Sequence, residues 1–227
     1  MTNSRNEYLK NIQDSLEKDL EDAIGNIDPK SQTEQDEIIK RKNDDSIYHK
    51  IQFNTNQLID HNNYKIFPNS DNRLNHLFTS LNTVRNHCLY WFELECAEKA
   101  IELNKLLNLY RFQKDKIPNY KTVPATNSNE NSNVLYVGIR QGGARVDKKD
   151  KAGNIILGLT NIVGRINQHL GYYKVASTQG LQLYEYAKGL DFNITIKVIE
   201  LEGLETKYLN IIEKLVAKEL KPLSGRH

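Results

Sequence analysis

The sequence predicts an α/β protein in which a helical N-terminal region precedes a small domain with a short mixed or antiparallel sheet flanked by helices. Two observations predict this fold class. Apolar residues recur at three- and four-residue steps through the first half of the chain, which is the period of a helix. After Pro118, apolar runs of strand length alternate with helical stretches, as in small α/β domains. We therefore expect a helical region over residues 1–115 and an α/β domain over residues 116–227.

The first half contains two predicted helices. Residues 5–24 have apolar side chains at helical spacing, and Gly25 and Pro29 follow them. Residues 30–50 are charged, with a weak helical pattern, and the Asn-rich residues 54–72 indicate a loop. The strongest helical signal covers residues 73–113. Its stripe consists of Leu74, Leu77, Phe78, Leu81, Val84, Cys88, Trp91, Leu94, Ala97, Ile101 and Leu106.

The second half alternates strands and helices. Residues 133–139 read as a buried strand, 154–159 as a second strand and 160–176 as a helix. Residues 193–201 follow as a strand. Residues 204–220 form a last helix, which Pro222 ends. The short links at the start of this order indicate a hairpin, which is consistent with a small sheet covered by helices.

Charge is unevenly distributed along the chain. Residues 1–115 carry a net charge of −4 and residues 116–227 a net charge of +6, so a polyanion is expected at the second half. No apolar run approaches the roughly 20 residues that span a bilayer, and the N-terminus has no apolar signal core. We expect a cytoplasmic protein without a membrane partner.

Two side chains on the predicted helix 160–176 suggest chemistry. Arg165 and His169 are four residues apart, so they share one helix face. A guanidinium beside an imidazole is explained by an anion such as a phosphate, which Arg can clamp and to which His can move a proton. The alternative is that both side chains are solvated on an exposed face.

The last predicted helix adds a carboxylate. Glu213 lies at the margin of an apolar stripe, with Leu209 and Ala217 four residues to either side. A half-buried carboxylate is a suitable ligand for one Mg²⁺ ion that keeps several waters. The alternative is a surface ion pair with Lys214 or Lys218.

These residues together resemble the GIY-YIG nuclease superfamily. The resemblance rests on Tyr136-Val-Gly138 in a strand, Arg165-x-x-x-His169 in the next helix, and Glu213 nine residues before Pro222. The Gly-rich, basic stretch from Gly138 to Arg145 is similar to that of the type II restriction endonucleases in the superfamily. The resemblance implies a divalent-metal-dependent enzyme that hydrolyses phosphodiester bonds in double-stranded DNA. It also implies one Mg²⁺ held by Glu213, with no small-molecule cofactor.

The resemblance leaves two alignments of the tyrosines. In the preferred one, Pro118-Asn-Tyr120 is the first half-motif, and Tyr120 and Tyr136 lie on adjacent strands joined by the polar residues 126–133. In the other, Tyr136 is the first tyrosine and Ile156-Leu-Gly158 replaces the second motif. One tyrosine would activate or orient water. Because a free Tyr has a pKa of about 10, it then needs a proton acceptor or cation, which His169 would provide.

The resemblance also implies DNA contacts and a partner subunit. Residues 140–153 are basic, and their cations would contact the DNA backbone; they are Arg140, Arg145, Lys148, Lys149 and Lys151. Cutting both strands requires two active sites or two encounters, so we expect a homodimer. We expect a sequence-specific type II restriction enzyme. The alternatives are a homing or structure-specific repair nuclease, and a non-catalytic nucleic-acid-binding protein on a nuclease fold.

Overall fold

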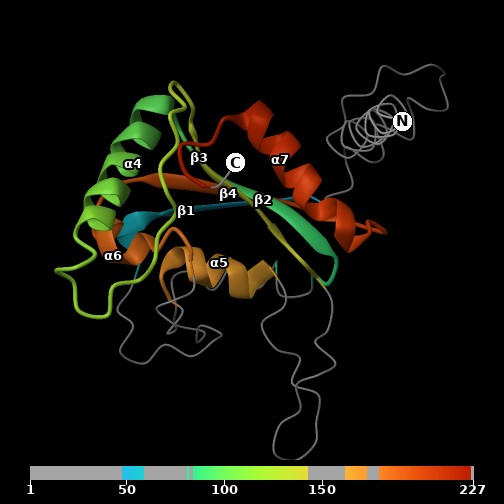
Figure 1. Ribbon diagram of the computed structural model, residues 1–227, viewed down its shortest axis with the longest axis horizontal. Coiled ribbons are helices and arrows are strands. Elements are labelled where there is room, and N and C mark those ends of the chain that lie inside the picture. Colours follow the sequence, from blue (N-terminus) through green and yellow to red (C-terminus); the bar gives the residue numbers. More distant parts are fainter. Residues whose placement is uncertain (1–47, 59–80, 82–83, 143–161, 173–178, 226–227) are drawn as a thin grey trace, which may run out of the picture.

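The computed structural model describes residues 48–58, 81, 84–142, 162–172 and 179–225. The predicted helix 5–24 and the predicted strand 154–159 lie outside these residues. The elements in the described ranges form one antiparallel sheet with helices on both faces (Figure 1). The protein is therefore of mixed α/β class, as the sequence predicts.

The sheet has four strands in the order β1-β4-β2-β3. β1 spans Tyr48–Asn54, β2 His87–Leu94, β3 Val134–Arg140 and β4 Asn193–Leu201. β2 pairs with β3 on one side and with β4 on the other, and β4 also pairs with β1. β4 has the predicted bounds, and β3 lies within one residue of them.

Helices cover both faces of this sheet, with α5 and α7 on opposite sides (Figure 1). α5 (Ile162–Leu170), α4 (Ala97–Phe112) and the short α6 (Leu183–Ala187) contribute to one core with Tyr90, Phe92 and Ile196 of the sheet. α7 (Leu209–Leu220) packs Ile212 and Val216 on a second, smaller core. Short 3-10 turns, η1 (Thr55–Gln57) and η2 (Thr206–Tyr208), follow β1 and precede α7.

The predicted helix over residues 73–113 is wrong over β2. Of the described residues in that range, residue 81 and α4 are helical, whereas residues 87–94 form a strand. β2 is an inner strand with a core on each face, and five of its eight residues are buried. A strand buried on both faces loses the alternation of apolar and polar residues, and its apolar positions can then fit a helical stripe.

The expected all-helical region 1–115 is wrong in its described part. β1 and β2 belong to the same sheet as β3 and β4, so that sheet contains strands from both sides of residue 115. β1 was expected as weak helix and loop. It is an edge strand with alternating burial, in which Ile51 and Phe53 are buried and Lys50 and Gln52 are exposed. This is the ordinary pattern of a strand with one solvated face.

The outer edge of β3 is covered by the residues that follow α7. The Leu223 amide donates to the Val134 carbonyl at 2.9 Å, and the Ser224 amide donates to the Leu135 carbonyl at 3.0 Å. The chain leaves α7 through Lys221, whose φ of 47° is left-handed, and then reaches Pro222. These backbone contacts pair part of an edge that would otherwise be open.

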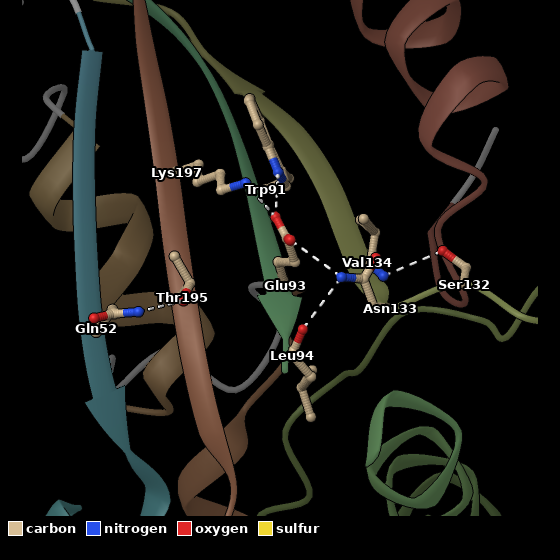
Figure 2. Close-up of polar contacts among 9 residues, drawn as sticks. All are labelled: Gln52, Trp91, Glu93, Leu94, Ser132, Asn133, Val134, Thr195 and Lys197. Carbon is tan, nitrogen blue, oxygen red and sulfur yellow. Dashed lines mark hydrogen bonds and ion pairs between the residues drawn. The ribbon is translucent and has the colours of Figure 1, made fainter. Parts of the chain in front are cut away.

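A polar network fixes the register of β2 against its neighbours (Figure 2). The Glu93 carboxylate accepts from Lys197 Nζ at 2.7 Å, from Trp91 Nε1 at 3.3 Å and from Asn133 Nδ2 at 3.1 Å. Burial raises the pKa of Glu93, but these donors outweigh it and the pKa is lowered. The network lies where the β2–β3 register shifts, between Phe92 and Glu93. It therefore joins β4, β2 and the start of β3 just before the candidate site.

Candidate functional site

The site begins with the pairing of β2 and β3. Tyr90 lies opposite Gly138 and Phe92 lies opposite Tyr136. The rings of Tyr90 and Tyr136 are stacked with centroids 6.3 Å apart. A Cβ atom on Gly138 would lie 2.5 Å from the Tyr90 hydroxyl oxygen and 2.7 Å from Tyr136 Cε1. Gly138 therefore has no room for a side chain, because the Tyr90 hydroxyl occupies that space.

α5 brings Arg165 and His169 to the same tyrosine, from one helix face as predicted. Arg165 Nε donates to the Tyr90 hydroxyl oxygen at 2.8 Å, and His169 Nε2 lies 3.0 Å from the same oxygen. Arg165 Nη2 donates to the Tyr136 hydroxyl at 3.2 Å. Four side chains from β2, β3 and α5 thus meet at one place.

The protonation state of His169 follows from its second nitrogen. The Leu181 backbone amide donates to His169 Nδ1 at 3.1 Å, and an amide can only donate. Nδ1 therefore carries no proton. Burial and the nearby Arg165 lower the pKa of His169 well below its ordinary value, so the ring is neutral with its proton on Nε2. His169 consequently donates to Tyr90. It is neither the cation nor the proton acceptor that the sequence led us to expect beside the tyrosine.

The Tyr90 oxygen accepts two hydrogen bonds, one from Arg165 and one from His169. Burial raises the pKa of Tyr90 strongly, and the guanidinium of Arg165 opposes this shift without cancelling it. Tyr90 therefore keeps its phenolic proton. Because both donors occupy the acceptor positions of the oxygen, this proton points in a third direction.

Arg165 is held on all three of its nitrogens. Besides the two tyrosines, Nη1 donates to Gln168 Oε1 at 2.8 Å and to the Gln179 carbonyl at 2.7 Å. Burial alone would lower its pKa, but the neighbouring tyrosine oxygens raise it, so the guanidinium is charged. The site thus contains one largely buried cation in a fixed orientation, which is the residue type suited to binding phosphate oxygens.

Glu213 approaches from α7 at the outer edge of β3. It is half-buried, and the Ile139 backbone amide donates to its carboxylate. Burial raises its pKa, and Arg165 and the Ile139 amide act in the opposite direction. The residues described by the structure contain no group of three or more His, Cys, Asp or Glu side chains that could hold a metal. A single carboxylate of this kind nevertheless fits an ion such as Mg²⁺ that retains most of its waters.

Tyr120 does not take the position predicted for it. The strand beside β3 is β2, and residues 118–120 are not in a strand. The Tyr120 ring stacks on Tyr110 with centroids 5.0 Å apart, and its hydroxyl oxygen accepts a hydrogen bond from the Val123 backbone. The preferred alignment is therefore wrong in its first strand, and Tyr90 stands where Tyr120 was expected. The aromatic run Tyr90-Trp91-Phe92, which is typical of strands, was the signal that could have located it.

The predicted DNA-contacting residues are only partly described. Arg140 is the last residue of β3, is half-buried and lies opposite Cys88 of the neighbouring strand β2. The other four, Arg145, Lys148, Lys149 and Lys151, lie outside the described residues, as does the alternative motif at 156–158.

Comparison with models of protein families, with curated proteins and with solved structures finds no match for this chain. In the described ranges, none of the helices has the length and apolar character needed to cross a membrane. Function is therefore inferred from the geometry of the site itself.

Proposed function

We propose that this protein is a Mg²⁺-dependent DNA endonuclease with a GIY-YIG-like active site, acting as a sequence-specific type II restriction enzyme on double-stranded DNA. The observation that carries the proposal is the Tyr90 oxygen, which accepts from Arg165 at 2.8 Å and from His169 at 3.0 Å in the shared site. Tyr136 and Glu213 lie around the same guanidinium. Mere packing does not require a buried cation, a neutral imidazole and two phenols to converge with a carboxylate at one place.

The chemistry assigned to these residues is hydrolysis of a phosphodiester. The oxygen of a water molecule forms a bond to phosphorus, the bond to the 3′ oxygen breaks, and a proton from the water passes to the leaving oxygen. Tyr90 orients the attacking water through its phenolic proton, and His169, by donating to the Tyr90 oxygen, keeps that proton from turning toward the imidazole. Arg165 adds fixed positive charge where negative charge develops on the phosphate.

Glu213 is the residue that would hold the metal ion. Its carboxylate is partly desolvated and close enough to Arg165 to affect the same phosphate. Bound there, Mg²⁺ would supply positive charge to the phosphate and to the leaving oxygen. Metal binding requires the deprotonated carboxylate, and burial raises the pKa of Glu213, so binding of the ion should weaken as the pH falls.

Plasmid cleavage tests the proposal. Purified protein is incubated with plasmid in Mg²⁺, with EDTA as the control, and Glu213→Gln is compared with Glu219→Gln, an exposed position on the same helix. We expect discrete fragments from wild type and Glu219→Gln, and none from Glu213→Gln or in EDTA.

Other outcomes select the alternatives. A smear of products would replace restriction with nonspecific cleavage, and preference for branched or nicked substrates would indicate a repair-type nuclease. DNA binding without cutting would support a non-catalytic protein. The homodimer expected for cutting both strands is tested by light scattering during size-exclusion chromatography.

A further inference from the structure

The backbone of Gln179, Gly180 and Leu181 touches both polar residues that α5 brings to the site. The Gln179 carbonyl accepts from Arg165 Nη1 at 2.7 Å. The Leu181 amide donates to His169 Nδ1 at 3.1 Å. This three-residue segment therefore offers a carbonyl oxygen to the Arg165 cation at one end and an N–H donor to the His169 imidazole at the other.

Gly180 lets this segment lie directly against the end of α5. A Cβ atom at Gly180 would be 2.8 Å from the Gln168 carbonyl oxygen and 3.0 Å from its carbon. These are backbone atoms of a helix, which cannot swing aside as the tip of a side chain can. Gly180 is not among the glycines with positive φ, so alanine is excluded there by lack of space and not by backbone conformation.

A second strip of backbone holds the segment from its other side. The Gly180 amide donates to the Thr122 carbonyl at 3.3 Å, and Gln179 Nε2 donates to the Val123 carbonyl at 3.4 Å. Lys121, next along, reaches the Gly171 carbonyl at 2.6 Å and the Glu185 carboxylate at 2.8 Å. The segment is thus fixed between α5 and residues 121–123.

We propose that residues 179–181 are a positioning element that fixes the tautomer of His169, and that Gly180 is the positioning residue on which this contact depends. With the Leu181 amide in place, His169 must carry its proton on Nε2 and donate to Tyr90. Without it, the neutral ring can place the proton on Nδ1 and present a bare Nε2 to the tyrosine. Tyr90 would then donate to His169, and its phenolic proton would no longer be available to a water in the site.

The kinetic part of this inference rests on the proposed nuclease function, whereas the tautomer does not. The two are tested separately. Ring ¹⁵N chemical shifts of His169 distinguish protonation at Nε2, at Nδ1 and at both nitrogens. We expect the Nε2-protonated form in wild type over the pH range in which the protein is folded.

Two variants remove the contact in different ways. Gly180→Ala pushes the segment away from Gln168. Replacing Leu181 with its α-hydroxy acid analogue turns the amide into an ester, which keeps the side chain and deletes only the N–H donor. Glu202→Ala is the control, because this side chain is exposed in the turn after β4 and its loss leaves the site untouched. We expect both test variants, but not the control, to give a His169 signal with protonation at Nδ1.

Single-turnover cleavage then measures the consequence. Losing the orientation of one hydrogen bond should lower the cleavage rate about tenfold in the two test variants with little change in DNA affinity. An unchanged ¹⁵N spectrum in the folded ester variant would overturn the positioning role, whatever the protein does to DNA. A shifted tautomer with an unchanged cleavage rate would overturn the link to catalysis. A wild-type protein that does not cut would refute the nuclease proposal while the ¹⁵N result still decides the tautomer.

Discussion

Replacing Tyr90 with phenylalanine removes one oxygen atom and keeps the ring that packs against Phe92 and His169. The Arg165 Nε–H and the His169 Nε2–H both lose their acceptor in a buried place. A hydrogen bond from a charged donor contributes about 1.5–3 kcal/mol and one from a neutral donor about 0.5–1.5 kcal/mol. Tyr90→Phe should therefore lower the free energy of unfolding by about 2–4 kcal/mol.

The same structure offers a matched control. The Tyr186 hydroxyl is also buried, and among the described residues it has no hydrogen-bond partner. Tyr186→Phe makes the same chemical change without breaking a hydrogen bond, so its stability should be unchanged or slightly increased. At about 2–4 °C per kcal/mol for a protein of this size, Tyr90→Phe should melt roughly 5–15 °C below Tyr186→Phe.

Urea unfolding and single-turnover cleavage of a short duplex containing the target site measure the two effects. Tyr90→Phe should cut about 10²–10⁴-fold more slowly than Tyr186→Phe, the range found for a lost water-orienting or proton-transfer group. Equal unfolding midpoints for the two variants would refute the hydrogen bonding argued for Tyr90. Equal cleavage rates would remove Tyr90 from the chemistry and leave it a structural role.

Four further substitutions test the rest of the site. Tyr120→Phe should cut normally in the single-turnover assay, because the Tyr120 hydroxyl is hydrogen-bonded to the Val123 backbone and not to Arg165; an inactive variant would support the alignment in which Tyr120 belongs to the first half-motif. Arg165→Lys keeps a charge but loses the fork that reaches both tyrosines, so cleavage should fall at least tenfold while filter-binding affinity changes little; full activity would mean that a diffuse charge suffices. Gly138→Ala should displace the Tyr90 hydroxyl and lower the cleavage rate as Tyr90→Phe does; a crystal structure of the variant with that hydroxyl unmoved would contradict this. Burial raises the pKa of Glu213 in the folded protein above its unfolded value. The charged carboxylate therefore lowers the stability of the fold above the folded pKa, and this cost disappears below the unfolded pKa. At pH 8 the free energy of unfolding of Glu213→Gln, measured with urea, should exceed that of wild type by roughly 0.5–1 kcal/mol; a difference that grows toward low pH would contradict this reasoning.

The sequence predicted those parts of the fold in which burial follows a regular period. β4 alternates buried and partly exposed residues over most of its length, and its predicted and observed bounds agree. α7 ends before Pro222, as expected from the residue that cannot continue a helix. In α5, the four-residue spacing placed Arg165 and His169 together because a helix repeats every 3.6 residues.

The same reasoning failed for β2 because both of its faces are covered. Its apolar side chains face two cores at once, so apolar residues stand at odd and even positions alike and the two-residue alternation of a strand is not visible in the sequence. The error passed directly to the site, because Tyr90 lies in the middle of this strand. The tautomer of His169 was also beyond sequence reasoning. It depends on a backbone amide twelve residues away whose position is set by the packing of Gly180 on α5.

The insertion of β4 between β1 and β2 has a consequence for the nascent chain. Residues 48–54 and 87–94 have no direct ladder to each other, and the strand that joins them is not synthesised until residue 201. Glu213 follows later still, on α7. A ribosome-bound chain that has released only its first 190 residues therefore possesses Tyr90, Arg165 and His169 but neither the strand that unites the sheet nor the carboxylate beside them. Whatever reaction the site performs, the polypeptide cannot carry it out until residue 213 has left the ribosome and joined the folded sheet.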